Sequence, residues 1–149
     1  MIYPNFINKN SCIGVPAPSN GAKIIEKKNK MLHAKETLED QGYNLVLSEN
    51  LYKSEKGRSA NAFIRAEEVN EMFKNKDIDL VLCASGGDFL VEILPYIDFE
   101  LIKENPKLCA GFSDPTGLLY PITTKCDIAT IYGQNFVAFG TQNLHKSQE

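Results

Sequence analysis

The sequence predicts one α/β domain, with a parallel sheet and helices on both of its faces. Short apolar or alternating segments, typical of strands, take turns along the chain with amphipathic segments typical of helices. This rhythm indicates βαβ units, which build parallel sheets through right-handed crossovers. One apolar segment, 80–84, is uninterrupted, as in strands that a parallel sheet buries on both faces. A chain of 149 residues has room for one ordinary domain.

The first predicted unit is a strand, a turn and a long helix. The apolar segment 12–15 runs into the sequence PAPSNG at 16–21, whose residues favour turns and helix caps. A helix is predicted over 23–41, and Gly42 follows as its C-terminal cap. Its apolar face is expected to consist of Ile24, Met31, Leu32 and Leu38.

The second unit begins with a short strand at 43–47, where apolar and polar residues alternate. A polar loop follows and ends at Ser59, which is a good N-cap for the next helix. This helix is expected to end near Asn75. Its core-facing stripe has helical spacing and consists of Ala62, Ala66, Val69 and Phe73.

The third unit follows the buried strand at 80–84. A short helix carries Leu90, Ile93 and Leu94 and precedes Pro95. A further helical turn at 99–103 leads to a fourth strand at 108–112. The sheet therefore has at least four strands. The order of elements favours a flavodoxin-like domain over residues 1–140, and the polar stretch 141–149 is expected to be a tail or the start of a linker.

Charge and composition exclude several classes of partner. The 16 basic and 19 acidic residues are spread along the chain, so neither nucleic acid nor an anionic membrane is an expected partner. No apolar run reaches the ~20 residues of a membrane span, and no signal peptide is recognisable, so we expect a cytoplasmic protein. No pair of Cys or His residues has the spacing of metal ligands, so no metal site is expected. Four widely spaced cysteines are expected to be free and structural: Cys12, Cys83, Cys109 and Cys126.

Two loops that follow predicted strands are candidates for chemistry, because ligands of parallel sheets collect at the carboxyl ends of the strands. In the first, Gly86 and Gly87 lie between Ser85 and Asp88, and paired glycines let backbone N–H groups approach an anion closely. A plain tight turn would also explain this sequence.

The second loop contains Ser113, between a strand that ends near Gly111 and an apolar helical segment. A serine in such a strand-to-helix turn is typical of a nucleophile elbow, although the second glycine of G-x-S-x-G is missing. The alternative is that Ser113 is an N-cap, with Asp114 in the first turn and Pro115 near the start of the helix.

The two loops together resemble the LD-carboxypeptidase family, whose nearer branch comprises the microcin C immunity peptidases. The resemblance lies in GVPAPS at 14–19, in LCASGGDFLVEILPYIDFELIKENPK at 82–107 and in GFSDPTGLL at 111–119. It extends from Cys12 to Gly140, with the motifs in the family's order. It implies a serine peptidase without a cofactor that removes the C-terminal residue of a short peptide, of a muropeptide or of a microcin-type aminoacyl adenylate.

The resemblance also implies roles for five residues. Ser113 would be the nucleophile, and the backbone N–H of Asp114 would be one oxyanion donor. Gly87, or its neighbour Asp88, would supply the second donor. Gly86 and Asp88 would contact the substrate.

The family's general base histidine and its orienting glutamate lie in a C-terminal domain that the 149 residues do not include. His33 falls within the first long helix, where a packing or solvent-facing role is expected, and His145 falls in the polar tail. We therefore expect the chain alone to be nearly inactive, because a serine without a base is a weak nucleophile. Apolar surface that normally meets the second domain would be uncovered, so a homo-oligomer is expected. The alternative function is a non-catalytic flavodoxin-like module that binds a small ligand.

Overall fold

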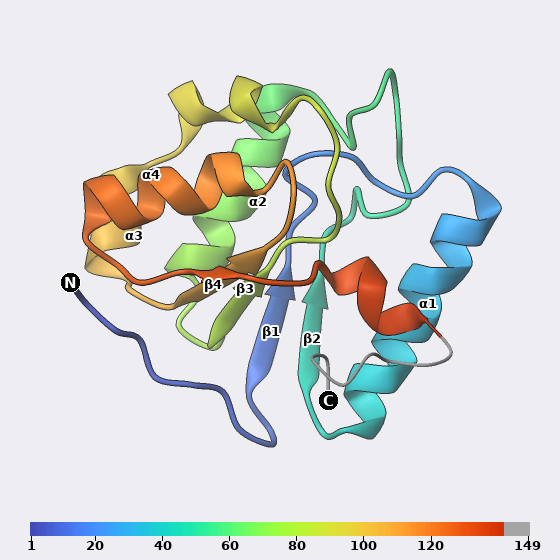
Figure 1. The fold of residues 1–149 in the computed structure, drawn as a ribbon, viewed down its shortest axis with the longest axis horizontal. Coiled ribbons are helices and arrows are strands. Elements are labelled where there is room, and N and C mark those ends of the chain that lie inside the picture. Colours follow the sequence, from blue (N-terminus) through green and yellow to red (C-terminus); the bar gives the residue numbers. More distant parts are fainter. Residues whose placement is uncertain (142–149) are drawn as a thin grey trace.

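A computed structural model describes residues 1–141 and contains one five-stranded sheet (Figure 1). All neighbouring strands are parallel, in the order β2-β1-β3-β4-β5. This is the flavodoxin-like order, so the predicted fold class is confirmed, with a fifth strand beyond the four that the sequence indicated. The strands are β1 (Cys12–Val15), β2 (Asn44–Leu47), β3 (Leu80–Leu82), β4 (Leu108–Gly111) and β5 (Ile131–Tyr132).

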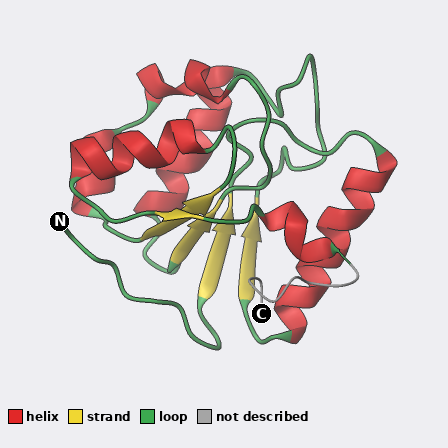
Figure 2. Cartoon of the chain, in the orientation of Figure 1, coloured by secondary structure: helices red, strands yellow, loops and turns green. Residues whose placement is uncertain are grey.

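Helices cover both faces of the sheet (Figure 2). One face carries α1 (Ile25–Asp40) and the 3₁₀ segment η2 (Phe136–Gly140), which pack against each other. The elements on the other face are α2 (Ala62–Lys74), the 3₁₀ segment η1 (Leu90–Tyr96), α3 (Phe99–Glu104) and α4 (Thr116–Cys126). Each face has its own cluster of buried apolar side chains.

The central strands supply both clusters, because successive residues of a strand point to opposite faces. Val81 and Cys109 join the cluster under α2 and α4, whereas Leu80 and Leu108 join the one under α1. All four cysteines are free, as predicted. Cys83 and Cys109 are neighbours in space, and their hydrogen bond and burial raise the pKa of the Cys109 thiol well above its ordinary value.

The predicted apolar face of α1 is only partly right. Met31 and Leu38 are buried, and Ala34 completes the face, at the spacing of one helical stripe. Ile24 and Leu32 are exposed. Ile24 precedes the helix with an extended backbone, and Leu32 is rotated about 100° from Met31 around the helix axis, which turns it away from the sheet.

Ser59 is not the N-cap of α2, contrary to the prediction. Asn61 takes that position, and its side-chain oxygen accepts a hydrogen bond from the Ile64 N–H at 3.0 Å. The Ser59 hydroxyl is buried and instead donates to the Ala17 carbonyl at 2.6 Å. Ser59 therefore ties the start of α2 to the loop that follows β1.

We expect Gly140→Ala to lower the free energy of unfolding by about 2–3 kcal/mol, as overpacking does. A Cβ on Gly140 would lie 1.7 Å from the Lys30 carbonyl oxygen in α1, and this backbone atom cannot rotate away. Urea denaturation measures the change. Gly117→Ala is the matched control, because its Cβ meets only the flexible end of Leu90 at 3.2 Å. Equal stabilities of the two variants would contradict the close packing of η2 on α1.

The predicted tail at 141–149, with His145, lies beyond the described residues from residue 142 onward. Within the part of the chain that is described, no helix has the length and apolar character that a membrane crossing needs.

Candidate active site

Three loops meet at the carboxyl edge of the sheet, where all five parallel strands end (Figures 1 and 2). The first loop comprises residues 16–21 after β1. The glycine loop comprises residues 85–89 after β3. The Ser113 turn comprises residues 112–115 between β4 and α4. The two loops singled out from the sequence therefore follow neighbouring strands, because β3 and β4 pair directly.

Ser113 has a left-handed backbone, with φ at 67°. This conformation costs a non-glycine residue about 1–2 kcal/mol, and such residues cluster at functional sites. The N-cap interpretation of Ser113 is wrong, because the cap position of α4 is Pro115 and no side chain caps the helix. Ser113 is exposed, and its carbonyl accepts the Thr116 N–H at 2.9 Å. The turn thus presents the hydroxyl at the surface instead of using it to start the helix.

Two glycines make room for this turn. A Cβ on Gly86 would lie 3.2 Å from Ser113 Cβ and 3.3 Å from its Oγ, so the glycine loop and the serine are in contact. A Cβ on Gly111 would lie 2.7 Å from Pro115 Cβ. The structure therefore brings Gly86 and Ser113 together, as expected for two loops that share a site.

The side chain of Asp114 joins all three loops. Its Oδ2 accepts a hydrogen bond from the hydroxyl of Ser19 in the first loop, and another from the Leu90 N–H at 2.9 Å, directly after the glycine loop. Ser19 is fully buried and also lies against Gly87, because a Cβ on Gly87 would come within 2.3 Å of its Oγ. Gly87 is therefore linked to the Ser113 turn through Ser19.

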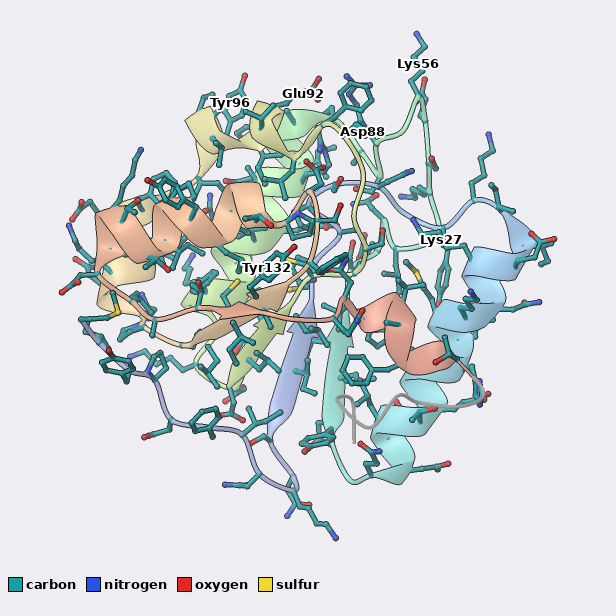
Figure 3. All side chains as sticks on the ribbon, in the orientation of Figure 1. Lys27, Lys56, Asp88, Glu92, Tyr96 and Tyr132 are labelled. Carbon is teal, nitrogen blue, oxygen red and sulfur yellow. The ribbon has the colours of Figure 1, made fainter. Side chains whose placement is uncertain are left out.

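Several backbone N–H groups in these loops have no protein acceptor within the described residues, and the two predicted oxyanion donors are among them. Within residues 1–141, neither the Asp114 N–H nor the Gly87 N–H donates a hydrogen bond. Both residues are partly exposed. Asp88 is exposed on the same loop (Figure 3).

The start of the glycine loop is fixed by Ser85 and Lys27. Ser85 Oγ donates to the Asn20 carbonyl at 2.6 Å and accepts from Lys27 Nζ at 3.0 Å. Lys27 also donates to the Gly21 carbonyl at 3.0 Å, and burial lowers the pKa of its ammonium. In Figure 3, Lys27 lies between α1 and the loops at the carboxyl edge. The sequence did not point to Lys27, which is one of many lysines in a charged helix.

The far end of the glycine loop adjoins an ionic cluster made of Arg65, Glu92 and Arg58. Glu92 pairs with Arg58 Nη2 at 2.5 Å and with Arg65 Nη2 at 2.7 Å. Hydrogen bonds from Arg58 and Arg65 lower the pKa of Glu92 to about 2, and Arg58 is the larger cause. This cluster was not predicted from the sequence. One signal was present, since Arg65 stands three residues after Ala62 and four before Val69, on the buried face of α2.

We expect Glu92→Gln to flatten the acid limb of the stability profile. The pKa of Glu92 in the folded chain, about 2, is below its ordinary value of 4.5, so its contribution to stability is complete above pH 4.5 and disappears as the pH falls towards 2. Denaturant titrations across this window should show a steeper loss for the wild type than for the variant. Identical slopes would show that the carboxylate is not held in its charged form.

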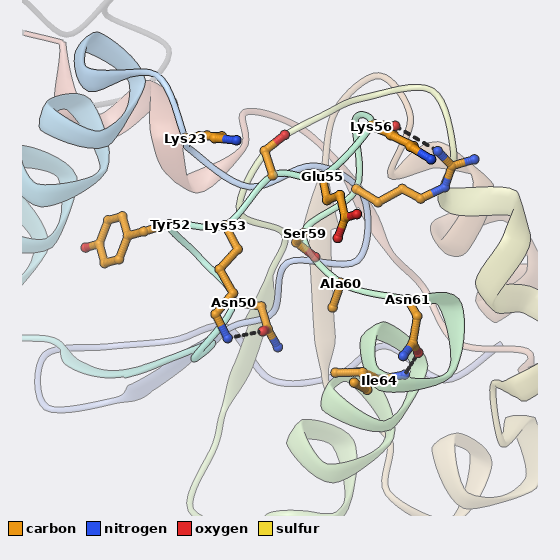
Figure 4. Close-up of a pocket in the computed structure, with 12 residues that line it drawn as sticks. Lys23, Asn50, Tyr52, Lys53, Glu55, Lys56, Ser59, Ala60, Asn61 and Ile64 are labelled. Carbon is orange, nitrogen blue, oxygen red and sulfur yellow. Dashed lines mark hydrogen bonds between the residues drawn. The ribbon is translucent and has the colours of Figure 1, made fainter.

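A hollow of about 860 Å³ lies beside these loops, between Lys23 and the segment 50–64 (Figure 4). Three lysines line it, together with Arg58, Glu55 and the buried Ser59. Ser54, also in its wall, donates to the side chain of Asn20 at 2.7 Å, and Asn20 lies next to Gly87. Ser113 does not line this hollow.

His33 is the one histidine within residues 1–141. It lies on α1, and its Nδ1 is 3.2 Å from the Gly140 carbonyl oxygen, which is a contact between α1 and η2.

Comparison with known proteins identifies relatives of the chain. Residues 13–133 match the model of the LD-carboxypeptidase N-terminal domain, Peptidase S66. A putative carboxypeptidase of Vibrio cholerae is 33% identical over 138 residues, which are 93% of this chain and 41% of that protein. The microcin C7 self-immunity protein MccF of Escherichia coli is 34% identical over 123 residues, which are 82% of this chain and 36% of that protein.

The fold agrees with these matches. The solved structure of MccF in complex with aspartyl sulfamoyl adenosine superposes with a TM-score of 0.90 at 31% identity, and the match covers 95% of this chain and 42% of that one. The chain thus spans less than half the length of the relatives that it matches, and it corresponds to their N-terminal part. From its fold and its sequence, this chain belongs to the LD-carboxypeptidase family of peptidases.

Proposed function

We propose that this chain is the nucleophile-bearing half of a serine carboxypeptidase. The observation that supports this most directly is the left-handed backbone of Ser113 in the turn between β4 and α4. This turn holds the hydroxyl of the exposed Ser113 next to Gly86. The N–H of Asp114 in the turn and the N–H of Gly87 in the contacting loop have no acceptor within residues 1–141. A nucleophile and oxyanion donors in such an arrangement are what acyl transfer requires.

In the proposed mechanism, Ser113 Oγ attacks the carbonyl carbon of the bond to the substrate's C-terminal residue. The negative charge on the carbonyl oxygen is stabilised by the N–H groups of Asp114 and Gly87, and one such donor is typically worth about 2.7–4 kcal/mol. A general base takes the proton from Oγ and gives it to the leaving amine. Water then hydrolyses the acyl-enzyme and regenerates Ser113. Gly86 and Asp88 line the approach of the substrate.

The base is assigned to a part of the protein outside these 149 residues. His33 is engaged between α1 and η2, and His145 lies outside the described residues. The relatives are more than twice as long as this chain. The proposed base histidine and its orienting glutamate are therefore expected to correspond to residues in the part of the relatives that this chain does not cover. The 149 residues alone are therefore expected to be catalytically incomplete.

The proposed substrate is a short peptide or a peptide-like molecule, either a muropeptide with an LD-amide bond or an aminoacyl adenylate. The first follows from the resemblance to LD-carboxypeptidases. The second is supported by MccF, which is a microcin C7 self-immunity protein and which has been solved with aspartyl sulfamoyl adenosine. The hollow of about 860 Å³ beside the first loop offers space for part of such a molecule. Homo-oligomerisation stays a prediction.

The test is to complete the enzyme. The chain is mixed with the segment of E. coli MccF that follows the matched part, and hydrolysis of a short muropeptide and of an aminoacyl adenylate is followed by mass spectrometry. We expect hydrolysis by the mixture and none by either part alone. A covalent fusion of the two parts repeats the test if they do not associate. A folded fusion that binds either compound without cleaving it would support the non-catalytic module instead.

A further inference from the structure

Arg65 is a buried cation whose contacts all lie at the carboxyl edge of the sheet. Its side chain is fully buried in α2. Nη1 donates to the Pro18 carbonyl at 2.9 Å and to the Phe89 carbonyl at 3.1 Å. Nη2 donates to Glu92 Oε2 at 2.7 Å. One guanidinium therefore connects the first loop, the end of the glycine loop and η1.

Stability alone does not account for an arginine here. Moving a charged side chain out of water is costly, and apolar residues of similar volume often replace buried ion pairs without loss of stability. The Nε of Arg65 is buried and has no partner among residues 1–141, which adds to this cost. The favourable contacts of the side chain are those that it makes with the loops.

These contacts fix the glycine loop at its far end. Phe89 is the last residue of the loop, and its carbonyl is held by Arg65. The next residue, Leu90, is held through its N–H by the carboxylate of Asp114. Arg58 supports the same end, because its guanidinium lies 3.6 Å from the centre of the Phe89 ring while it shares Glu92 with Arg65.

The first loop is fixed by the same residue. Pro18, whose carbonyl accepts from Arg65, directly precedes Ser19, and Ser19 separates Gly87 from Asp114. In the glycine loop, Gly86, Gly87 and Asp88 lie between Ser85 and Phe89, which are both held by hydrogen bonds. The position of the Gly87 N–H therefore depends on two carbonyl groups that one guanidinium binds.

We propose that Arg65 is a positioning residue, which holds the glycine loop and the first loop so that the Gly87 N–H keeps its place beside Ser113. Glu92 orients the guanidinium from the solvent side. The structural half of this inference is independent of the reaction. Its catalytic consequence rests on the proposed function.

Hydrogen exchange of the 149-residue chain tests the structural half. Arg65→Met and Arg65→Lys are compared with Lys107→Met, which removes another buried cation; Lys107 Nζ donates to the Met72 and Asn75 carbonyls at the far end of α2. We expect both Arg65 variants to exchange at least about tenfold faster in segments 16–21 and 84–90. Lys107→Met should leave these segments as in the wild type and affect residues 72–76.

Two outcomes would overturn the inference. One is unchanged exchange in segment 84–90 of the Arg65 variants, and the other is an equal increase throughout the chain. If Arg65→Met does not fold, Arg65→Lys and Glu92→Gln decide, because they keep a side chain of similar size. Arg65→Lys keeps the charge but replaces the planar fork by a single ammonium, so its exchange should lie between wild type and Arg65→Met.

Kinetics of the completed enzyme test the catalytic half. Arg65→Lys should lower kcat at least about tenfold with KM nearly unchanged, because an oxyanion donor acts in the transition state. Lys107→Met should change neither constant at temperatures below its melting point. If Arg65→Lys has wild-type kcat although hydrogen exchange shows a loosened glycine loop, only the catalytic consequence is rejected. Absence of activity in every variant and in the wild type would reject the proposed function and leave the exchange result standing.

Discussion

Ser113→Ala removes hydrolysis by the completed enzyme, with an expected fall in kcat of at least about a thousandfold. The substitution deletes the atom that forms the acyl-enzyme, while the backbone donors of Asp114 and Gly87 stay in place. Because nucleophile and base act as a unit, the rate that remains comes only from binding and oxyanion stabilisation. Single-turnover assays of the mixture, followed by mass spectrometry of the products, measure this fall and detect the acyl-enzyme.

Ser113→Gly separates chemistry from folding. Glycine adopts a φ of 67° without strain, so this variant should be as inactive as Ser113→Ala and more stable than it by about 1 kcal/mol. Ser11→Ala is the matched serine control, because Ser11 lies at the opposite edge of the sheet, just before β1. Hydrolysis by the isolated chain that persists in Ser113→Ala would overturn the assignment, since the chemistry would then come from other residues.

Gly87→Ala is expected to lower kcat of the completed enzyme by about a hundredfold to a thousandfold, the usual effect of losing one oxyanion donor. The new Cβ would lie 2.3 Å from Ser19 Oγ, and Ser19 is fully buried and bonded to Asp114. Because the buried Ser19 is held by this hydrogen bond, we expect the loop to move and to carry the Gly87 N–H out of its place.

Gly133→Ala is the control for this substitution, because its Cβ would meet only the Cγ2 methyl group of the exposed Ile131, at 3.3 Å. It should retain wild-type kcat. The oxyanion role of Gly87 would be refuted by a Gly87→Ala enzyme that has wild-type kcat although hydrogen exchange shows the loop displaced.

The sequence predicted most of the fold because strands buried on both faces have an uninterrupted apolar pattern. The segment 80–84 is the clearest case: all five of its residues are buried, and the first three form β3. The strand β5 has no such pattern, because Ile131 and Tyr132 are exposed at the edge of the sheet and pair with β4 alone. Its two residues could be assigned only after the topology was known.

The candidate site was predicted unevenly for a similar reason. Ser113 and the paired glycines are visible in the sequence because each follows an apolar strand. The contacts that hold these loops together are not visible in the sequence, because they join residues that are far apart along the chain. Examples are the contact of Ser19 with Asp114 and that of Arg65 with Pro18. The left-handed backbone of Ser113 is equally invisible, because the sequence around it also fits a capped helix.

The position of β1 between β2 and β3 has a consequence for the order of folding. Its pairing with β2 joins residues 12–15 to 44–47, whereas its pairing with β3 joins residues 13–14 to 80–81. Closing the longer loop costs more entropy, and contacts between distant residues form slowly. We expect β1, α1 and β2 to form early, and β3 and β4 to pair separately. The first loop then meets the glycine loop in the last long-range step, so a chain that has completed most of its sheet still lacks the site.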